Sequence, residues 1–414
     1  MNEAKQKFRL TGLERAWILY DVGNSAFVLL VATLIPIFFN ALAEEGGLSS
    51  VEYLAYWGYA ASAVTVITAV LSPILGTLAD TRNYKKPIFT FCVAVGVIGC
   101  CAMGMASTWL PFLLIFIFAK VGFSGSLVFY DSMLSDVTVP DRMDEVSSKG
   151  YAWGYIGSCV PFVVCLALVL GAGSIGISQM TALNLALFIT AAWWLVTTLP
   201  LLRQYKQVHF VEVQEHAIRQ SFARIGHTLR HLKEDRQVFW FLLAFFCYID
   251  GVYTIIDMAT AYGTALGLDT TGLLLALLVT QIVAFPSALV FGRLSGQYPS
   301  GTLIPVCIAA YAGIALFAFF LKHQWQFWVL AVVVGMFQGG IQALSRSHFA
   351  KIIPPEKSGE YFGLFDICGK GASFLGTMIV SVGSQLTGSA NVGVGSLIVL
   401  FVVGFVLFRV SDRK

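Results

Sequence analysis

The chain has 414 residues, of which 57% are hydrophobic and 12% are charged, with a formal net charge of +3 at pH 7. Soluble globular domains carry about 25% charged residues, so this composition excludes an ordinary soluble protein. The small net charge gives no indication of a nucleic-acid partner. The eight cysteines lie within apolar stretches without a C-x-x-C pair, which indicates small core residues rather than disulfides or metal ligands.

Long apolar stretches recur from one end of the chain to the other. A helix needs about 20 apolar residues to cross the bilayer core. Twelve such stretches are predicted, at 14–43, 51–79, 87–107, 109–137, 148–172, 178–202, 238–265, 271–298, 301–321, 325–350, 358–384 and 390–410. No small-residue cleavage site follows the polar first dozen residues, so we expect the first stretch to remain as a span. The sequence predicts an all-α, multi-pass integral membrane protein.

The positive charges indicate which way the spans point. Lysine and arginine gather in alternate connections and at both ends of the chain, whereas the opposite connections carry only Lys322. Loops rich in Lys and Arg remain in the cytoplasm. Both termini are therefore predicted to be cytoplasmic, and we expect the chain in the cell (inner) membrane of a bacterium.

The longest connection, 203–237, separates two sets of six spans, which predicts bundles at 1–202 and 238–414. Within it, apolar residues recur at helical spacing beside basic ones, which favours an amphipathic helix on the inner membrane surface. His227 and His231 are four residues apart and could share a metal, but a solvated polar face is the interpretation we favour.

The two sets of six are related by an internal repeat at a separation of about 214 residues. The pairs are Gly76-x-Leu78 with Gly292-x-Leu294, and Gly125, Pro140 and Gly157 with Gly339, Pro354 and Gly371. Two helical bundles related by an axis along the membrane normal are a known transporter plan, with the substrate site between the halves.

A motif follows the second predicted span. It reads Gly76-Thr-Leu-Ala-Asp80-Thr-Arg82-Asn-Tyr-Lys85-Lys86. The segment closely resembles the G-x-L-x-D-(x)n-R/K signature between helices 2 and 3 of the major facilitator superfamily. We interpret Gly76, Asp80, Arg82 and Lys86 as a conformational latch, because glycine allows close helix approach and Asp80 can lie at the amino-terminal dipole of a neighbouring helix.

Two further segments resemble a smaller branch of that superfamily, related to the fungal vacuolar amino-acid effluxers of autophagy. They are Trp17-Ile-Leu-Tyr20-Asp21-Val-Gly23-Asn24-Ser25-Ala26-Phe27, and the stretch from Asp136-Val-Thr-Val-Pro140 to Gly150-Tyr-Ala-Trp153-Gly154-Tyr155-Ile-Gly157. The branch normally has alanine at the position of Gly23. The resemblance implies export or exchange of amino acids or similar small solutes.

Polar residues inside the spans concentrate on helices 1, 4, 7 and 10, which line the central cavity in the superfamily. The candidate cavity residues are Asp21, Asn24, Lys120, Asp131, Asp250, Tyr253, Asp257, Gln338, Gln342 and Arg346. Charges near the bilayer centre cost about 3 kcal/mol or more, so they usually face a partner or a water-filled cavity. Lys120 and Arg346 could bind a carboxylate, while the acids could face an amine or carry a proton. A zwitterionic solute suits this lining.

Structural alternatives exist for several of these residues. Arg346 and Asp131 could pair across the cavity without touching a substrate, and Asp21 could act as a cap or latch. Asp366 and Lys370 are four residues apart and could neutralise one another. Asp250 and Asp257 share a helix face without an obvious local partner, which favours a functional interpretation.

These features predict a secondary active transporter that moves a small, polar, amino-acid-like solute by alternating access and with proton coupling. The chain has no P-loop, G-x-S-x-G turn or H-E-x-x-H motif, so we expect no enzyme activity, no cofactor and no metal. Membrane lipid and the substrate are its expected partners, and a monomer is expected. A drug or lipid exporter of the same fold and a non-transporting sensor are the alternatives, and sodium coupling stays open.

Overall fold

The computed structural model describes residues 9–212, 230, 232 and 234–412. The first half contains α1 (Gly12–Ala32), α2 (Leu34–Glu45), α3 (Ser50–Ala79), α4 (Lys85–Met103), α5 (Trp109–Ser132), α6 (Leu134–Val137), α7 (Pro140–Leu170) and α8 (Gln179–Gln204). The second half contains α10 (Arg236–Ala265), α11 (Thr270–Leu294), α12 (Ser300–Ala318), α13 (Gln324–Ile352), the short 3-10 helix η1 (Pro355–Lys357), α14 (Ser358–Thr387), α15 (Ala390–Gly395) and α16 (Ile398–Ser411).

The helices confirm the all-α membrane prediction. Within the described residues, eleven segments are long and apolar enough to cross a membrane. The remaining predicted span, 358–384, is occupied by the 30-residue α14. The amphipathic helix and the histidine pair predicted within 203–237 lie almost wholly outside the described residues.

Several predicted spans differ in detail from the structure: 109–137 is divided into α5 and α6, and 390–410 into α15 and α16. Two further differences concern the first and the fifth predicted spans. The first is divided into α1 and α2 at Thr33, because the ring of Pro36 prevents a regular helix across the preceding turn. The span predicted from 148 begins eight residues earlier, since Pro140 occupies the first turn of α7. Proline suits that position because its fixed φ fits a helix and its missing N–H would be unpaired there anyway. The charged residues before 148 therefore form an additional stretch of helix rather than a loop.

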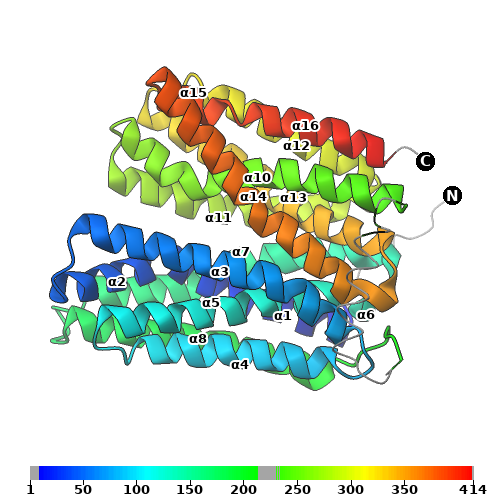
Figure 1. Cartoon of the computed structure of the whole chain (residues 1–414), viewed down its shortest axis with the longest axis horizontal. Helices are drawn as coiled ribbons and strands as arrows, with labels where there is room; N and C mark the ends of the chain where they lie inside the picture. Colours follow the sequence, from blue (N-terminus) through cyan, green and yellow to red (C-terminus); the bar gives the residue numbers. More distant parts are fainter. Residues whose placement is uncertain (1–8, 213–229, 231, 233, 413–414) are drawn as a thin grey trace.

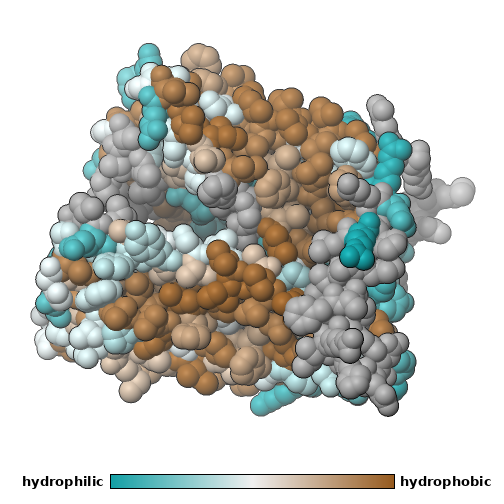
Figure 2. All heavy atoms as spheres, in the orientation of Figure 1, coloured by the Kyte–Doolittle hydropathy of each residue, from teal (hydrophilic) through white to brown (hydrophobic). Residues whose placement is uncertain are grey.

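The two halves lie side by side, and both ends of the described chain emerge at the same end of the molecule (Figure 1). We call this the termini end. Across the boundary, α3 packs against α14, and α7 packs against α11 and α13. Brown, hydrophobic residues cover much of the lateral surface in Figure 2, as expected for a surface that faces lipid. The same view shows a hollow between the halves, towards the end opposite the termini.

Gly23, where the resembling branch has alanine, packs tightly against α8. A Cβ at this position would clash with the hydroxyl of Thr197 and lie 3.2 Å from the Cα of Trp194. The Thr197 hydroxyl is already bonded to the carbonyl of Trp193 at 2.8 Å. The absence of a side chain at Gly23 therefore lets α1 and α8 approach closely, as small residues do between membrane helices.

Candidate functional site

Asp80 joins the two halves at the termini end. It ends α3 in the first half, and its buried carboxylate accepts hydrogen bonds from the backbone N–H groups of Gly359 (2.7 Å) and Glu360 (2.9 Å) in the first turn of α14. These donors have no partner within their own helix, and the helix dipole favours a negative charge there. The structure thus places Asp80 at a helix amino terminus of the other half.

The cation buried beside this carboxylate is Lys85. Its ammonium lies 2.8 Å from the Ser358 hydroxyl, 3.7 Å from Asp80 and 3.8 Å from Asp136. The predicted latch residues Arg82 and Lys86 lie further out. Arg82 makes an exposed ion pair with Glu212 at 3.4 Å, while the ammonium of Lys86 reaches the carbonyl of Tyr205 at 3.5 Å. Lys85 stands in the same sequence motif, but our predicted latch did not include it.

The backbones of the two halves touch at Gly76 and Gly359. A Cβ on Gly76 would lie 2.8 Å from the carbonyl carbon of Gly359, and a Cβ on Gly359 would lie 2.8 Å from Oδ1 of Asp80. Each added carbon would also clash with the carbonyl oxygen of the opposite glycine. The Asp80 contact therefore requires glycine on both sides.

The variant Gly359→Ala is expected to separate the halves at the termini end, because the added methyl group meets backbone atoms that cannot rotate away. Spin labels at the exposed positions Val139 and Gln297 would report a longer distance between the halves. Gly58→Ala, on α3 where a Cβ has open space, is the control and should leave that distance unchanged. An unchanged distance in Gly359→Ala would contradict a latch at this contact.

Arg346 makes the second set of contacts between the halves. It projects from α13, is 2% exposed, and donates to the carboxylate of Asp131 at 3.0 Å. It also donates to the hydroxyl of Ser147 at 2.9 Å and to its carbonyl at 3.0 Å, and lies 3.7 Å from Asp21. All of these partners belong to the first half. Asn24, one helical turn from Asp21, contacts that carboxylate at 3.5 Å.

Three aromatic rings of the first half surround the same guanidinium. Its carbon lies 4.6 Å from the ring centre of Trp17, 5.3 Å from that of Tyr130 and 4.3 Å from that of Tyr151. Guanidinium groups stack favourably on aromatic faces. The side chains around Arg346 thus provide both charge and stacking, and a substrate carboxylate would have to compete with Asp131. We call Arg346 and these first-half partners the Arg346 cluster.

Further contacts between α7 and α13 continue this boundary. Asp144 accepts from the hydroxyl of Ser347 at 2.6 Å and pairs with Lys351 at 2.5 Å. Nearer the middle of both helices, the hydroxyl of Tyr155 donates to the side chain of Gln342 at 3.0 Å. The two halves are therefore joined by polar contacts from the termini end to the Arg346 cluster and beyond.

Beyond the cluster, opposite charges from the two halves come near one another. Lys120 of α5 acts electrostatically on Asp257 of α10, and Asp257 is exposed. The Lys120 ammonium also lies 4.8 Å from the ring centre of Phe123. Tyr253 lies one helical turn from Asp257, and the charges of both Asp131 and Asp257 act electrostatically on its side chain. These residues form a polar region with both signs between the halves.

Asp250 occupies a different environment from the other candidate acids. It is fully buried, and both of its carboxylate oxygens lie 2.9 Å from the backbone nitrogen of Gly376 in α14. The Thr254 hydroxyl donates to the same carboxylate at 3.3 Å. Asp250 is thus packed between two helices of the second half rather than facing the first half.

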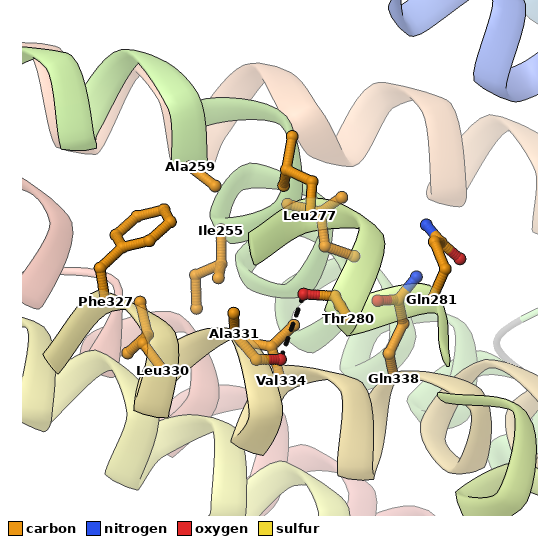
Figure 3. Close-up of a pocket in the computed structure, with 11 residues that line it drawn as sticks. Ile255, Ala259, Leu277, Thr280, Gln281, Phe327, Leu330, Ala331, Val334 and Gln338 are labelled. Carbon is orange, nitrogen blue, oxygen red and sulfur yellow. Dashed lines mark hydrogen bonds between the residues drawn. The ribbon is translucent and has the colours of Figure 1, made fainter. Parts of the chain in front are cut away.

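A small, mostly apolar crevice lies beside the polar region, between α10, α11 and α13. Figure 3 shows Phe327 at one end and the amides of Gln281 and Gln338 at the other, with the Thr280 hydroxyl bonded to the carbonyl of Ala331. Gln338 is 5% exposed, and its carbonyl oxygen has no hydrogen-bond partner within the described part of the chain. A ligand donor could satisfy that oxygen.

The segment after α8 folds back onto the Asp80 region. Asp136 in α6 accepts a bond of 2.6 Å from the hydroxyl of Tyr205 and contacts the ring of His209 at 3.0 Å. This hydrogen bond to the carboxylate raises the pKa of His209 against the opposing effect of its partial burial. Burial opposes ionisation of Asp136, but its bonds from His209 and the charge of Lys85 prevail and lower its pKa.

The His209 contact predicts a pH dependence of stability. Because the folded pKa lies above the unfolded value of about 6.5, the stabilisation is complete below that pH and is lost as the pH rises through the folded pKa. The melting temperature should therefore fall on going from about pH 6 to pH 8.5, and His209→Gln should flatten that fall. His323→Gln, at an exposed position at the opposite end, is the control. Identical pH profiles for wild type and His209→Gln would contradict the prediction.

Comparison with known proteins shows the family of this chain. The profile of the family described as "Vacuole effluxer Atg22 like" matches residues 13–141 and 135–414. The chain belongs to this family. An uncharacterized MFS-type transporter of Bacillus subtilis (strain 168), YxiO, is 42% identical over 404 residues, covering 96% of this chain and 94% of YxiO. Autophagy-related protein 22 of Coccidioides immitis (strain RS) is 24% identical, covering 83% of this chain and 70% of the fungal protein.

Solved structures show the fold of this Atg22-like chain. The human organic anion transporter MFSD10 superimposes with a TM-score of 0.72 at 13% identity, over 96% of this chain and 98% of MFSD10. The major facilitator transporter FucP, in its outward conformation, also gives 0.72, at 17% identity, over 97% of this chain and 98% of FucP. The Atg22-like chain is thus a multi-pass membrane transporter with the major facilitator fold, as the sequence motifs predicted.

Proposed function

We propose that this chain is a secondary active transporter for a small, polar, amino-acid-like solute, coupled to protons and acting as a monomer in the inner membrane of a bacterium. The observation that carries the proposal is that Lys120 of the first half lies near enough to Asp257 of the second half for the two opposite charges to interact electrostatically. A zwitterion can bind a cation through its carboxylate and an anion through its amine, and would thereby bridge the two halves.

Alternating access supplies the mechanism. The Asp80 contact and the Arg346 cluster join the halves at the termini end, while the surface is hollowed at the opposite end (Figure 2). With the termini in the cytoplasm, as the basic connections predict, this is an outward-facing state. We propose that segments 1–202 and 238–414 move against each other, joined by 203–237. Substrate and proton would shift the populations by binding the two states with different affinities.

Counterflow in proteoliposomes tests the proposal. Vesicles containing the purified chain are loaded with an amino-acid mixture and given labelled amino acids outside, with and without an imposed pH gradient. We expect the label to accumulate by exchange and net accumulation to respond to the gradient. Folded, correctly inserted protein that exchanges none of them would contradict an amino-acid-like substrate. Binding without exchange would indicate a sensor.

An exporter of apolar solutes is the second candidate, and the apolar lining of the crevice beside Gln338 favours it. In the same vesicles, transport of a hydrophobic cationic dye without any amino-acid counterflow would support the exporter. The opposite charges of Lys120 and Asp257 favour a zwitterionic substrate, because an apolar substrate has no charged groups that could pair with them.

A further inference from the structure

The candidate acids between the membrane helices differ in their partners. Asp21 and Asp131 face Arg346, and the charge of Lys120 acts on Asp257. Asp250 differs from all three: among the side chains that the structure describes, no Lys or Arg nitrogen lies within 4 Å of its carboxyl group. Its position is about 20 Å along α10 from Arg236, at 1.5 Å per residue, which places it deep within the span.

Among the residues that the structure describes, the contacts of Asp250 are all uncharged. Two donors reach its carboxyl group, the N–H of Gly376 and the hydroxyl of Thr254. An ionised carboxylate offers about four acceptor positions, so these two donors leave it under-satisfied. A Cβ on Gly376 would lie 2.7 Å from Asp250 Oδ1 and would clash with Thr254. The carboxyl group is therefore held directly against the backbone of α14.

Other titratable groups lie further from this carboxyl. On its own helix, Cys247 and Tyr253 stand three residues before and after it, and Asp257 stands seven residues after it. On α14, Asp366 stands ten residues before Gly376, and the side chain of Lys370 lies outside the described residues. On α16, the charged residues Arg409 and Asp412 stand at the carboxyl-terminal end.

We propose that Asp250 carries the coupling proton. A charge in mid-membrane costs about 3 kcal/mol or more, so the carboxyl group is protonated in the buried state seen here. Because α14 also packs against α3 of the first half, we expect the movement of the halves to draw α14 away from α10. Water then reaches the carboxyl group and the O–H bond breaks, releasing the proton to that side. Water on the other side supplies the next proton, so the cycle moves one proton and needs no other reactant.

This inference rests on the proposed function and deepens it by assigning the proton to one of the candidate acids. It also separates two roles on one helix face. Asp257 is exposed and lies near Lys120, which suits substrate contact. Asp250 is buried and has no cationic partner among the described side chains, which suits a proton. Exchange of one solute for another needs no net proton movement, whereas accumulation driven by a pH gradient does.

The test compares wild type, Asp250→Asn and Asp269→Asn in proteoliposomes. Asparagine keeps the shape of a neutral carboxyl group and can still accept from Gly376, but it cannot titrate. We expect Asp250→Asn to retain amino-acid counterflow and its melting temperature, and to lose gradient-driven accumulation. Asp269 is the exposed N-cap of α11, where asparagine caps equally well, so Asp269→Asn should retain both activities.

A second readout does not depend on substrate. The infrared C=O band of a protonated, buried carboxyl group should be present in wild type at neutral pH and weaker in Asp250→Asn. Gradient-driven accumulation in Asp250→Asn would overturn the assignment, and so would a large fall in melting temperature together with lost counterflow, which would show a structural role. Wild type could show the infrared band, and Asp250→Asn lack it, while wild type exchanges no amino acid. That result would contradict the proposed substrate but would still support protonation of Asp250.

Discussion

Replacing Arg346 with alanine is expected to abolish transport and to lower the melting temperature markedly. The guanidinium is the buried cation that pairs with Asp131 and lies beside Asp21. Removing one partner of a buried ion pair costs about 3–5 kcal/mol, because the remaining charge stays buried without compensation. Ser147 would also lose two hydrogen bonds, and the termini end could no longer close as it does here.

Counterflow and thermal unfolding of the purified variant measure these two effects. Arg409→Ala, which removes an exposed arginine of the same half, is the control and should match wild type in both. Arg346→Lys should remain inactive, since lysine keeps the charge but loses the planar fork and the stacking on Trp17 and Tyr151.

The double variant Arg346→Ala with Asp131→Asn separates the effect of the unpaired carboxylate on stability from the effect of the missing contact between the halves on transport. Removing the orphaned carboxylate should recover part of the melting temperature, whereas transport should stay absent because the contact between the halves is still missing. A melting temperature for Arg346→Ala equal to that of wild type would show that the Arg346 cluster contributes nothing to folding.

The number and order of the spans could be predicted from the sequence because the bilayer leaves little choice. Without water, every backbone polar group in the membrane core must be satisfied within its own helix, so a long apolar stretch is sufficient evidence for a span. The length of an apolar stretch does not predict whether the helix continues outside the membrane. For that reason the first turns of α7, from Pro140 onward, were missed.

That error concealed several contacts between the halves. Once α7 begins at Pro140, four residues follow at spacings of three and four, which places them on one face of the helix: Asp144, Ser147, Tyr151 and Tyr155. All four contact α13 in the structure. Asp144 contacts Lys351 and Ser347. Ser147 and Tyr151 contact Arg346, and Tyr155 contacts Gln342. The spacing was therefore present in the sequence, and a correct helix start would have revealed it.

The different surroundings of Asp250 and Asp257 could not be predicted from their own helix. Residues seven apart share a face of α10, so the sequence treats them alike. What distinguishes them is Gly376, whose missing side chain admits Asp250 to the backbone of α14. Lys85 was likewise beyond sequence reasoning, because two adjacent lysines begin α4 and only the packing against Ser358 decides which is buried.

Asp257→Asn is expected to remove transport while the chain remains folded. Asp257 is exposed, and charges at exposed positions contribute little to stability, about 0–1 kcal/mol even in an ion pair, so the melting temperature should stay close to that of wild type. The loss of its charge would instead remove the group proposed to bind the substrate amine. Both counterflow and gradient-driven accumulation should therefore disappear, in contrast to Asp250→Asn, which should retain counterflow.

Two matched variants sharpen this expectation. Asp257→Glu keeps the negative charge and should retain measurable counterflow, whereas Lys120→Gln removes the facing cation and should fail like Asp257→Asn. An amine without a carboxylate should compete with the substrate more weakly than the zwitterion in wild type, since it can satisfy only one of the two charges. Wild-type counterflow and accumulation in Asp257→Asn would remove this residue from the mechanism, and with it the argument that a zwitterion bridges the two halves.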